Sequence, residues 1–371
     1  MRADIFCRVV DNYGDIGVCW RLARRLAQVP GWRPRLWVDD LRAFARIQPG
    51  LDPEQARQQC LGIDIVHWTP APPADLTPGD AVIEAFACDP PDAFLDAMRQ
   101  VHPVWINLEY LSAEAWIESC HGLPSQRPDG LVKHFYFPGF TPATGGLLRE
   151  PGLSAERDAL QASPEQQESV LRALGVPQHA LSRRRDGARL VSLFCYPDAP
   201  VDALASALAA DPRPTVLLAP EGVAPGLEAA CAAPGRPALV RLPFVSQPDF
   251  DRLLWCADLN FVRGEDSFVR AAWAARPLVW QIYPQHDQVH LDKLEAWLAR
   301  YPATEGARAL IRAWNQPDAP QALGPSLAAA LAPEAWQAWA RAARDWDAAQ
   351  ADRPDLAENL AAFCAELAKK R

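Results

Sequence analysis

The chain has 371 residues, of which 49% are hydrophobic and 22% charged, a composition typical of globular rather than disordered proteins. At this length two domains are more common than one. Its 37 lysines and arginines are outnumbered by 46 aspartates and glutamates, and the net charge of -9 argues against nucleic-acid binding and is compatible with a cationic partner.

The nine cysteines are scattered, and none forms a Cys-x-x-Cys pair, so we expect neither a zinc site nor a disulfide framework. Several lie in apolar runs, as buried thiols do in a reducing compartment; Cys7, Cys195 and Cys256 are examples. No apolar run approaches membrane-spanning length, and a strand is predicted where a signal peptide would lie. We therefore expect a cytoplasmic protein without membrane association.

In chain order, the first part of the sequence alternates strand-like and helix-like segments. Apolar runs predict strands at 3–10, 34–38, 63–67, 80–85 and 103–108. Amphipathic spacing predicts helices at 16–29, 40–47, 53–60, 91–100 and 112–118. This alternation predicts an α/β domain over residues 1–150, with a mostly parallel sheet covered by helices on both faces.

Residues 121–187 interrupt this alternation. The segment 134–146 is aromatic and then rich in Gly, Pro and Thr, which suits an ordered loop at a cleft and a rigid inter-domain connection equally well. Residues 151–187 are polar and charged, with a helical piece near 164–174. We expect them to link two domains.

The alternation restarts at Arg189 and predicts a second α/β domain over residues 188–350. Strands are predicted at 189–196, 214–219, 238–242, 257–262 and 277–281, and helices at 200–210, 222–232, 247–256, 266–275 and 286–300. The remainder reads as helical, and residues 351–371 are predicted to form a C-terminal helix with one apolar face. Two such domains predict a ligand-binding cleft between them, because open α/β sheets bind ligands at their strand ends.

The first strand-to-helix turn, residues 11–17, contains two carboxylates and two glycines. Its position at a strand end makes it a candidate site. Structural roles are the alternative, since Asp15 could cap the following helix and Asp11 could form a turn with its own backbone. The glycine fingerprint of dinucleotide-binding proteins is absent, so a Rossmann oxidoreductase is not expected.

A second cluster follows the strand predicted at 257–262. Arg263 lies beside a helix start at Asp266 or Ser267, where backbone N–H groups and a guanidinium could bind a phosphate. Glu265 is expected to face the cleft without a cation of its own. A helix cap with a surface ion pair would explain the same residues.

Aromatic and amide side chains follow other strand ends. Phe244 and Gln247 could stack on a base and hydrogen-bond to it, and Phe194 and Tyr196 could close the same pocket, although a buried Phe is more often part of a core. Nearby, Asp249-Phe250-Asp251 matches the Asp-x-Asp pattern of metal-dependent glycosyltransferases. We expect no metal there, because acidic residues are common where a helix begins and the pattern is short.

Three stretches together resemble the EarP family, the protein-arginine rhamnosyltransferases that modify translation elongation factor P. They are residues 10–17 with Trp20-Arg21-Leu22-Ala23, residues 137–146 and residues 263–267. The resemblance implies a GT-B fold, in which two Rossmann-like domains face each other across a cleft. It also implies transfer of L-rhamnose from dTDP-β-L-rhamnose to one arginine of elongation factor P, with inversion and without a metal, which activates the factor to rescue ribosomes stalled at polyproline.

The resemblance further implies roles for single residues. In the acceptor-binding N-terminal domain, Asp15 matches the proposed general base and Asp11 its partner carboxylate. Glu265 matches the essential glutamate of the donor site in the C-terminal domain. The other candidates are donor-binding residues: Phe244, Gln247, Phe194, Tyr196, Arg263, Asp266, Ser267 and Gly17.

The chemistry of such a reaction explains why two carboxylates are needed. A guanidinium is a poor nucleophile, because its lone pairs are delocalised and it stays protonated. One Asp could orient it in a planar fork, and the other could take the proton as the bond forms. Two other classes stay open: a GT-B nucleotide-sugar transferase with a different acceptor, and a non-catalytic protein that holds a basic partner in an acidic cleft.

Overall fold

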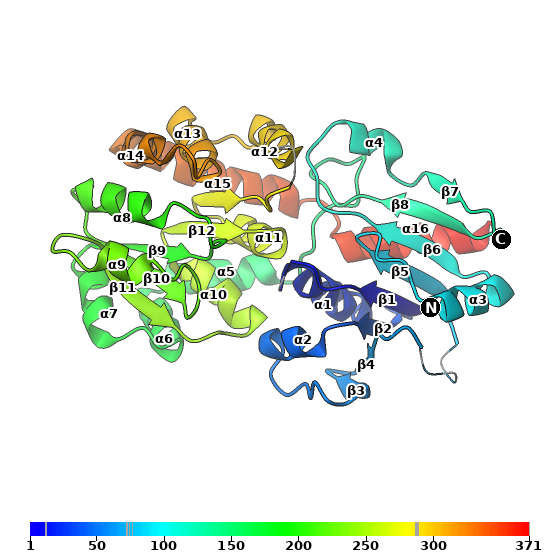
Figure 1. Ribbon diagram of the computed structural model, residues 1–371. Coiled ribbons are helices and arrows are strands. Elements are labelled where there is room, and N and C mark those ends of the chain that lie inside the picture. Colours follow the sequence, from blue (N-terminus) through cyan, green and yellow to red (C-terminus); the bar gives the residue numbers. More distant parts are fainter. Residues whose placement is uncertain (12, 72, 74, 76, 286–288, 371) are drawn as a thin grey trace. The chain divides into compact units, whose positions relative to one another are not determined.

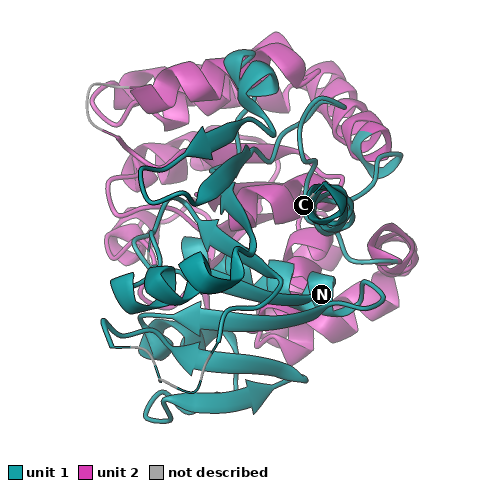
Figure 2. Ribbon diagram, turned by 90° about the vertical axis from the view of Figure 1, so that its right-hand side faces the viewer, with its two compact units in different colours: residues 1–151, 350–371 teal, residues 152–349 magenta. Residues whose placement is uncertain are grey.

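The computed structural model describes the chain except residues 12, 72, 74, 76, 286–288 and 371, and it consists of two compact units (Figure 2). Unit 1 comprises Met1–Pro151 and Gln350–Arg371, and unit 2 comprises Gly152–Ala349. Each unit is an α/β structure built on a largely parallel sheet, as the alternation of segments predicted. None of the helices formed by the described residues is long and apolar enough to cross a membrane.

Over the described residues, the sheet of unit 1 has eight strands in the order β3-β4-β2-β1-β5-β6-β8-β7 (Figure 1). At its centre, β1 (Arg2–Cys7) lies between β2 (Arg33–Val38) and β5 (Ala81–Ala85) and is parallel to both. The parallel set is completed by β4 (Ile63–His67), β6 (Val104–Leu108) and β8 (Val132–Tyr136), while β3 (Arg57–Cys60) and β7 (Pro124–Gln126) are antiparallel edges. From β1 the chain first adds strands on the side of β2 and then crosses over to add the later strands on the side of β5. The topological switch point therefore lies between β1 and β5, and open α/β sheets bind ligands at such a point.

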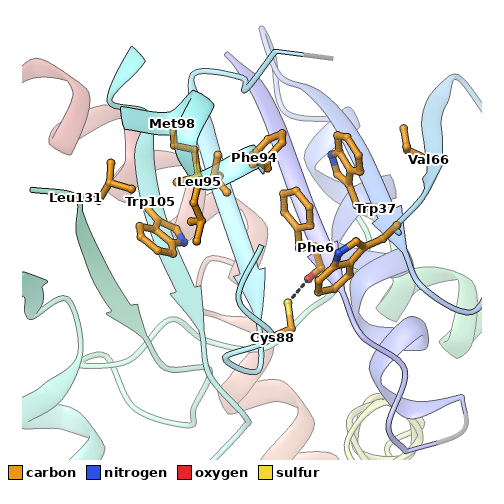
Figure 3. Packing of buried hydrophobic residues seen from close by; sticks show 11 residues of the cluster. Phe6, Trp37, Val66, Cys88, Phe94, Leu95, Met98, Trp105 and Leu131 are labelled. Atoms are coloured by element: carbon orange, nitrogen blue, oxygen red, sulfur yellow. Dashed lines mark hydrogen bonds between the residues drawn. The ribbon is translucent and has the colours of Figure 1, made fainter. Parts of the chain in front are cut away.

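The helices of unit 1 are α1 (Gly14–Ala27), α2 (Leu41–Ile47), α3 (Asp92–Val101), α4 (Trp116–Cys120) and α16 (Leu356–Lys369). Figure 3 shows the aromatic core between α3 and the sheet. The ring of Phe6 lies 5.1 Å from that of Trp37 and 4.8 Å from that of Phe94, measured between centroids. This packing buries one face of the central strands β1 and β2.

The last helix of the chain, α16, belongs to unit 1 and contacts α1 and β6. Asp355 caps it by accepting the N–H groups of Ala357 and Glu358. The same carboxylate forms a buried ion pair with Arg25 of α1, with 2.6 Å between Nη2 and Oδ2. The helix expected to stand apart at 351–371 is therefore part of the first unit.

The Gly- and Pro-rich segment 137–146 packs against the start of α16 within unit 1. The side-chain amide of Asn359 donates a hydrogen bond to the carbonyl of Gly145, at 3.0 Å. A Cβ at Gly145 would lie only 2.4 Å from the ring of Tyr136, so a larger residue would push these groups apart. Close packing inside unit 1 explains the glycine at this position.

Unit 2 has a five-stranded parallel sheet over its described residues, in the order β11-β10-β9-β12-β13. The strands are β9 (Arg189–Leu193), β10 (Thr215–Pro220), β11 (Ala238–Leu242), β12 (Leu259–Arg263) and β13 (Leu278–Gln281). Its helices are α5 (Leu153–Ala162), α6 (Pro164–Ala173), α7 (Gln178–Arg185), α8 (Val201–Ala210), α9 (Leu227–Cys231), α10 (Gln247–Cys256), α11 (Asp266–Trp273), α12 (Val289–Arg300), α13 (Glu305–Trp314), α14 (Leu323–Leu331) and, except for its last two residues, α15 (Pro333–Ala351), with the short η2 (Pro320–Ala322). The topological switch point of this sheet lies between β9 and β12, because β10 and β11 are added on one side of β9 and β12 and β13 on the other.

Apart from shifted element ends, the structure differs from the predicted elements as follows. The helix predicted at 53–60 is wrong, because residues 57–60 form β3, which the turn at Leu61 and Gly62 folds back onto β4. The strands β7 and β8 were not predicted. Residues 151–187, expected as a linker, form α5, α6 and α7 and belong to unit 2, where α5 and α6 pack against α10.

Candidate functional site

In unit 1, Asp11 lies in the connection from β1 to α1 and Asp15 lies at the start of α1, at the edge of the sheet where β1 and β5 end. Helix α1 begins at Gly14, two residues earlier than predicted, so Asp15 lies in its first turn. The Asp15 side chain is buried, with 3% exposure for the residue. Its Oδ2 accepts hydrogen bonds from the backbone N–H groups of Val10 and Asp11, both at 2.8 Å.

Asp15 therefore closes the loop before α1 and does not act as its N-cap. The N-cap position is Tyr13, which makes no side-chain capping bond. Asp11 is folded over the helix start, because a Cβ at Gly14 would lie 2.8 Å from Asp11 Oδ2. Gly17 is buried in the same first turn, where its N–H donates to the carbonyl of Tyr13. Two carboxylates thus belong to one backbone-fixed turn, which can accept the N–H groups of a guanidinium.

Thiols surround the end of β1 beside this turn. Burial raises the pKa of the Cys7 thiol well above its usual range, and the neighbouring Cys19, Asp15 and Cys88 raise it further. Burial likewise raises the pKa of Cys88. These thiols therefore stay neutral and form an apolar surrounding for the Asp15 turn.

In unit 2, three candidate residues meet at the adjacent ends of β9 and β12. The guanidinium carbon of Arg263 lies 4.4 Å from the ring centre of Phe194 and 4.8 Å from that of Tyr196. Arg263 also donates from Nη1 to the carbonyl of Cys195, at 3.0 Å. Cation–π contacts and this hydrogen bond hold the guanidinium next to the first turn of α11.

The turn from β12 into α11 contains the candidates Glu265, Asp266 and Ser267, and it begins at a glycine. Gly264 has φ +63°, a backbone conformation that favours glycine. Glu265 takes the N-cap position, and Lys293 of α12 donates to its Oε1 at 2.9 Å. The expectation that Glu265 has no cation of its own is wrong, because Lys293 pairs with it. No motif or spacing linked Lys293 to this turn. The Ser267 hydroxyl donates to the carbonyl of Arg263.

The remaining candidates connect α10 to this turn. Gln247, the first residue of α10, is buried, and its Nε2 donates to Asp266 Oδ2 at 3.4 Å. Phe250 of α10 packs edge-on against Phe194, with 5.7 Å between ring centroids. Phe244 is half-buried in the loop between β11 and α10. The structure thus brings the unit 2 candidates to the carboxyl edge of one sheet, whereas Gly17, Asp11 and Asp15 lie in unit 1.

Both aspartates of the Asp-x-Asp pattern, Asp249 and Asp251, form hydrogen bonds to neighbouring side chains of unit 2. Asp249 accepts a hydrogen bond from the hydroxyl of Ser246, the N-cap of α10, at 2.8 Å. Both carboxylate oxygens of Asp251 accept from the buried guanidinium of Arg270, Oδ1 at 3.0 Å from Nε and Oδ2 at 2.7 Å from Nη2. Within the described part of the chain, no three His, Cys, Asp or Glu side chains gather in a metal-binding arrangement.

Residues 3–365 match the model of a protein family described as Elongation-Factor P (EF-P) rhamnosyltransferase EarP. The chain belongs to the EarP family. It is 49% identical to the protein-arginine rhamnosyltransferase of Pseudomonas aeruginosa, with 98% of both chains covered. A solved structure concerned with EarP-mediated arginine glycosylation of translation elongation factor EF-P is 36% identical, with a TM-score of 0.66 over 98% of this chain and 99% of that one.

More distant structures establish the wider fold of the EarP family. The spinosyn rhamnosyltransferase SpnG, complexed with thymidine diphosphate, has a TM-score of 0.55 at 13% identity, covering 98% of this chain and 100% of that one. It is a glycosyltransferase of the GT-B fold, and at this identity the likeness concerns the fold alone. The family match and the 49% identical relative confirm the resemblance to EarP and the assignment to the glycosyltransferases, and the solved structures confirm the predicted GT-B fold.

Proposed function

We propose that this protein transfers L-rhamnose from dTDP-β-L-rhamnose to one arginine side chain of translation elongation factor P, in the cytoplasm and with inversion at the anomeric carbon. The modification activates the factor for ribosomes stalled at polyproline. Membership of the EarP family supports the proposal. The observation in the chain itself that carries it is the turn in which two backbone N–H groups fix Asp15 beside Asp11.

The two carboxylates of unit 1, Asp11 and Asp15, activate the acceptor. Asp11 orients the guanidinium by accepting its N–H groups, and Asp15 takes the proton from the nitrogen that attacks the sugar. Since free arginine keeps its proton at neutral pH, the proton leaves only as the new C–N bond forms and the bond from the anomeric carbon to the diphosphate oxygen breaks. Exclusion of water from the site would strengthen these interactions.

Donor binding falls to unit 2, with Gly17 of unit 1 as a further donor contact. Phe244 stacks on the thymine, and Gln247 hydrogen-bonds to it. The leaving diphosphate accepts hydrogen bonds from Arg263 and from backbone N–H groups at the start of α11, that of Ser267 among them, which stabilise its negative charge. Phe194 and Tyr196 hold Arg263 in place, Gln247 tethers Asp266, and Glu265 orients the sugar from its ion pair with Lys293.

The decisive experiment is intact-mass analysis of elongation factor P after incubation with this protein and dTDP-β-L-rhamnose. The factor should gain the mass of one rhamnosyl residue, and a factor whose acceptor arginine is replaced by lysine should gain none. A small-molecule or glycan acceptor would point to a GT-B transferase of another class. Binding of the factor without any mass gain, unaffected by Glu265→Gln, would favour a non-catalytic acidic protein.

Phe244→Ala and Gln247→Ala should weaken dTDP binding. Loss of a stacked aromatic should cost on the order of 1–3 kcal/mol, by analogy with bases stacked on aromatic side chains. Gln247→Ala also removes the bond to Asp266. Calorimetric titration with dTDP measures both effects, and Gln178→Ala, at the exposed first position of α7, is the matched control. Unchanged affinity in both site variants would place the base elsewhere.

Transfer should continue in excess chelator. The motivation is that Arg263 and the start of α11 can supply the positive charge that a diphosphate needs, and that Asp251 already binds Arg270. Rates measured with and without EDTA check this. Complete loss of activity, restored by Mg²⁺ or Mn²⁺, would contradict it.

A further inference from the structure

The segment Phe86–Asp89, which follows β5 in unit 1, has an unusual backbone. Phe86, Ala87 and Asp89 have φ values of +58°, +53° and +46°, in the left-handed region that side-chain-bearing residues rarely adopt. Such conformations persist only where the surroundings enforce them, and they concentrate at functional sites. Since β5 pairs with β1, this segment lies next to the Asp11/Asp15 turn.

Neighbouring strands hold the segment from both sides. The N–H of Phe86 donates to the carbonyl of Leu108 at 2.7 Å, and the N–H of Ala87 donates to the Asn107 side chain at 3.1 Å. On the other side, the Cys88 thiol lies 3.4 Å from the carbonyl of Phe6 in β1, as the dashed line in Figure 3 shows. The segment is therefore fixed to both β6 and β1.

A buried ion pair supports the segment from β5 itself. The Glu84 carboxylate is fully buried, and Lys133 of β8 lies 2.6 Å from its Oε1 and 3.5 Å from Asp89 Oδ1. Burial raises the pKa of Glu84, and the adjacent Lys133 opposes that rise. Burying a charge pair is costly, and this pair ties the exposed end of the strained segment to the central sheet.

The segment presents an aromatic pair with acidic neighbours. The rings of Phe86 and Tyr110 are stacked, with centroids 4.3 Å apart and an interplanar angle of 12°, and Tyr110 is 39% exposed. Carboxylates from three adjacent strand ends share this edge: Asp11 after β1, Asp89 after β5 and Glu109 after β6. Flat aromatic surface with negative charge matches an arginine side chain in its protein loop.

We propose that Phe86 and Tyr110 form the surface on which the acceptor protein's arginine-bearing loop docks beside Asp11 and Asp15. This rests on the proposed function and specifies its acceptor site. The strained segment positions Phe86 before the acceptor arrives, so little ordering is needed on binding. Phe86 therefore contributes to the affinity for the acceptor and not to the affinity for the nucleotide.

Phe86→Gly tests the proposal without endangering the fold, because glycine adopts φ +58° without strain. The Kd for elongation factor P, titrated without donor, should rise about tenfold or more, while dTDP affinity and the melting temperature do not fall. Tyr110→Ala should weaken acceptor binding similarly. The control is Leu61→Gly, an exposed apolar residue that also has a positive φ; it lies at the β3–β4 turn, where β4 begins, whereas Phe86 is half-buried where β5 ends.

Acceptor affinity within twofold of wild type in both site variants would overturn the proposal, as would an equal loss in Leu61→Gly. A wild-type chain that fails to bind the factor would overturn it as well. The proposed function is judged separately, by the gain in mass of the factor. A chain that binds the factor through Phe86 but transfers no rhamnose would support the docking surface and refute the proposed reaction.

Discussion

Asp15→Asn should lower turnover by roughly 10²–10⁴-fold, the usual contribution of a general base, while dTDP affinity and the melting temperature stay nearly unchanged. The structure explains why the fold should tolerate the change. A single oxygen, Oδ2, accepts both loop N–H groups, and an asparagine can place its amide oxygen at the same point. The substitution therefore removes the negative charge and the proton acceptor but retains the loop.

Single-turnover rates, dTDP titration and melting curves measure the effect. Asp15→Ala is the control for loop closure: it loses both hydrogen bonds and should lower the melting temperature as well as the rate. Asp11→Asn should raise the KM for the acceptor in addition to slowing turnover. A stable Asp15→Asn variant that binds donor and turns over at a near-normal rate would refute the role of Asp15 as base.

Asp251→Ala should lower the free energy of unfolding of unit 2 by about 3–5 kcal/mol, because it removes a carboxylate that pairs with a buried guanidinium. Arg270 is 1% exposed, and Asp251 accepts from two of its nitrogens. For a unit of this size each kcal/mol should shift the melting temperature by about 2–4 °C. Differential scanning calorimetry of the full chain gives both quantities.

The double variant Asp251→Leu/Arg270→Met is the control, since it removes both charges and should recover most of the lost stability. If Asp249 and Asp251 bound a catalytic metal, the pattern would be reversed. Asp251→Ala would then melt normally and lose metal-dependent activity. A normal melting curve would therefore contradict the structural role assigned to Asp251.

Local signals predicted most of the secondary structure. Helix α10 begins at Gln247 as predicted, because Ser246 caps it and proline follows in its first turn. Residues 57–60 were mistaken for helix because their strand exists only through pairing with β4. The packing partner of α16 was missed for a related reason, since an amphipathic helix does not specify which domain covers its apolar face.

In the candidate site, too, features local in the sequence were predicted and contacts between distant residues were not. The turns after β1 and β12 were found because glycines and carboxylates cluster within a few residues of each other. Partners that lie far apart in the sequence were missed: Lys293 for Glu265, Lys133 for Glu84 and Asn107 for Ala87. These pairs depend on which strands and helices the topology brings together, and no spacing along the chain encodes that.

The inclusion of α16 in unit 1 reverses the usual order of domain completion during synthesis. Domains generally fold as they leave the ribosome, the N-terminal one first. Here Gly152–Ala349 is a single stretch that is synthesised before residues 350–371, which complete unit 1. Arg25, on the helix that starts at the Asp15 turn, cannot pair with Asp355 until that residue, 330 positions later in the chain, has been synthesised. While the residues of α16 are still being added, the chain thus contains every residue of unit 2, whereas unit 1 still lacks the helix that covers α1.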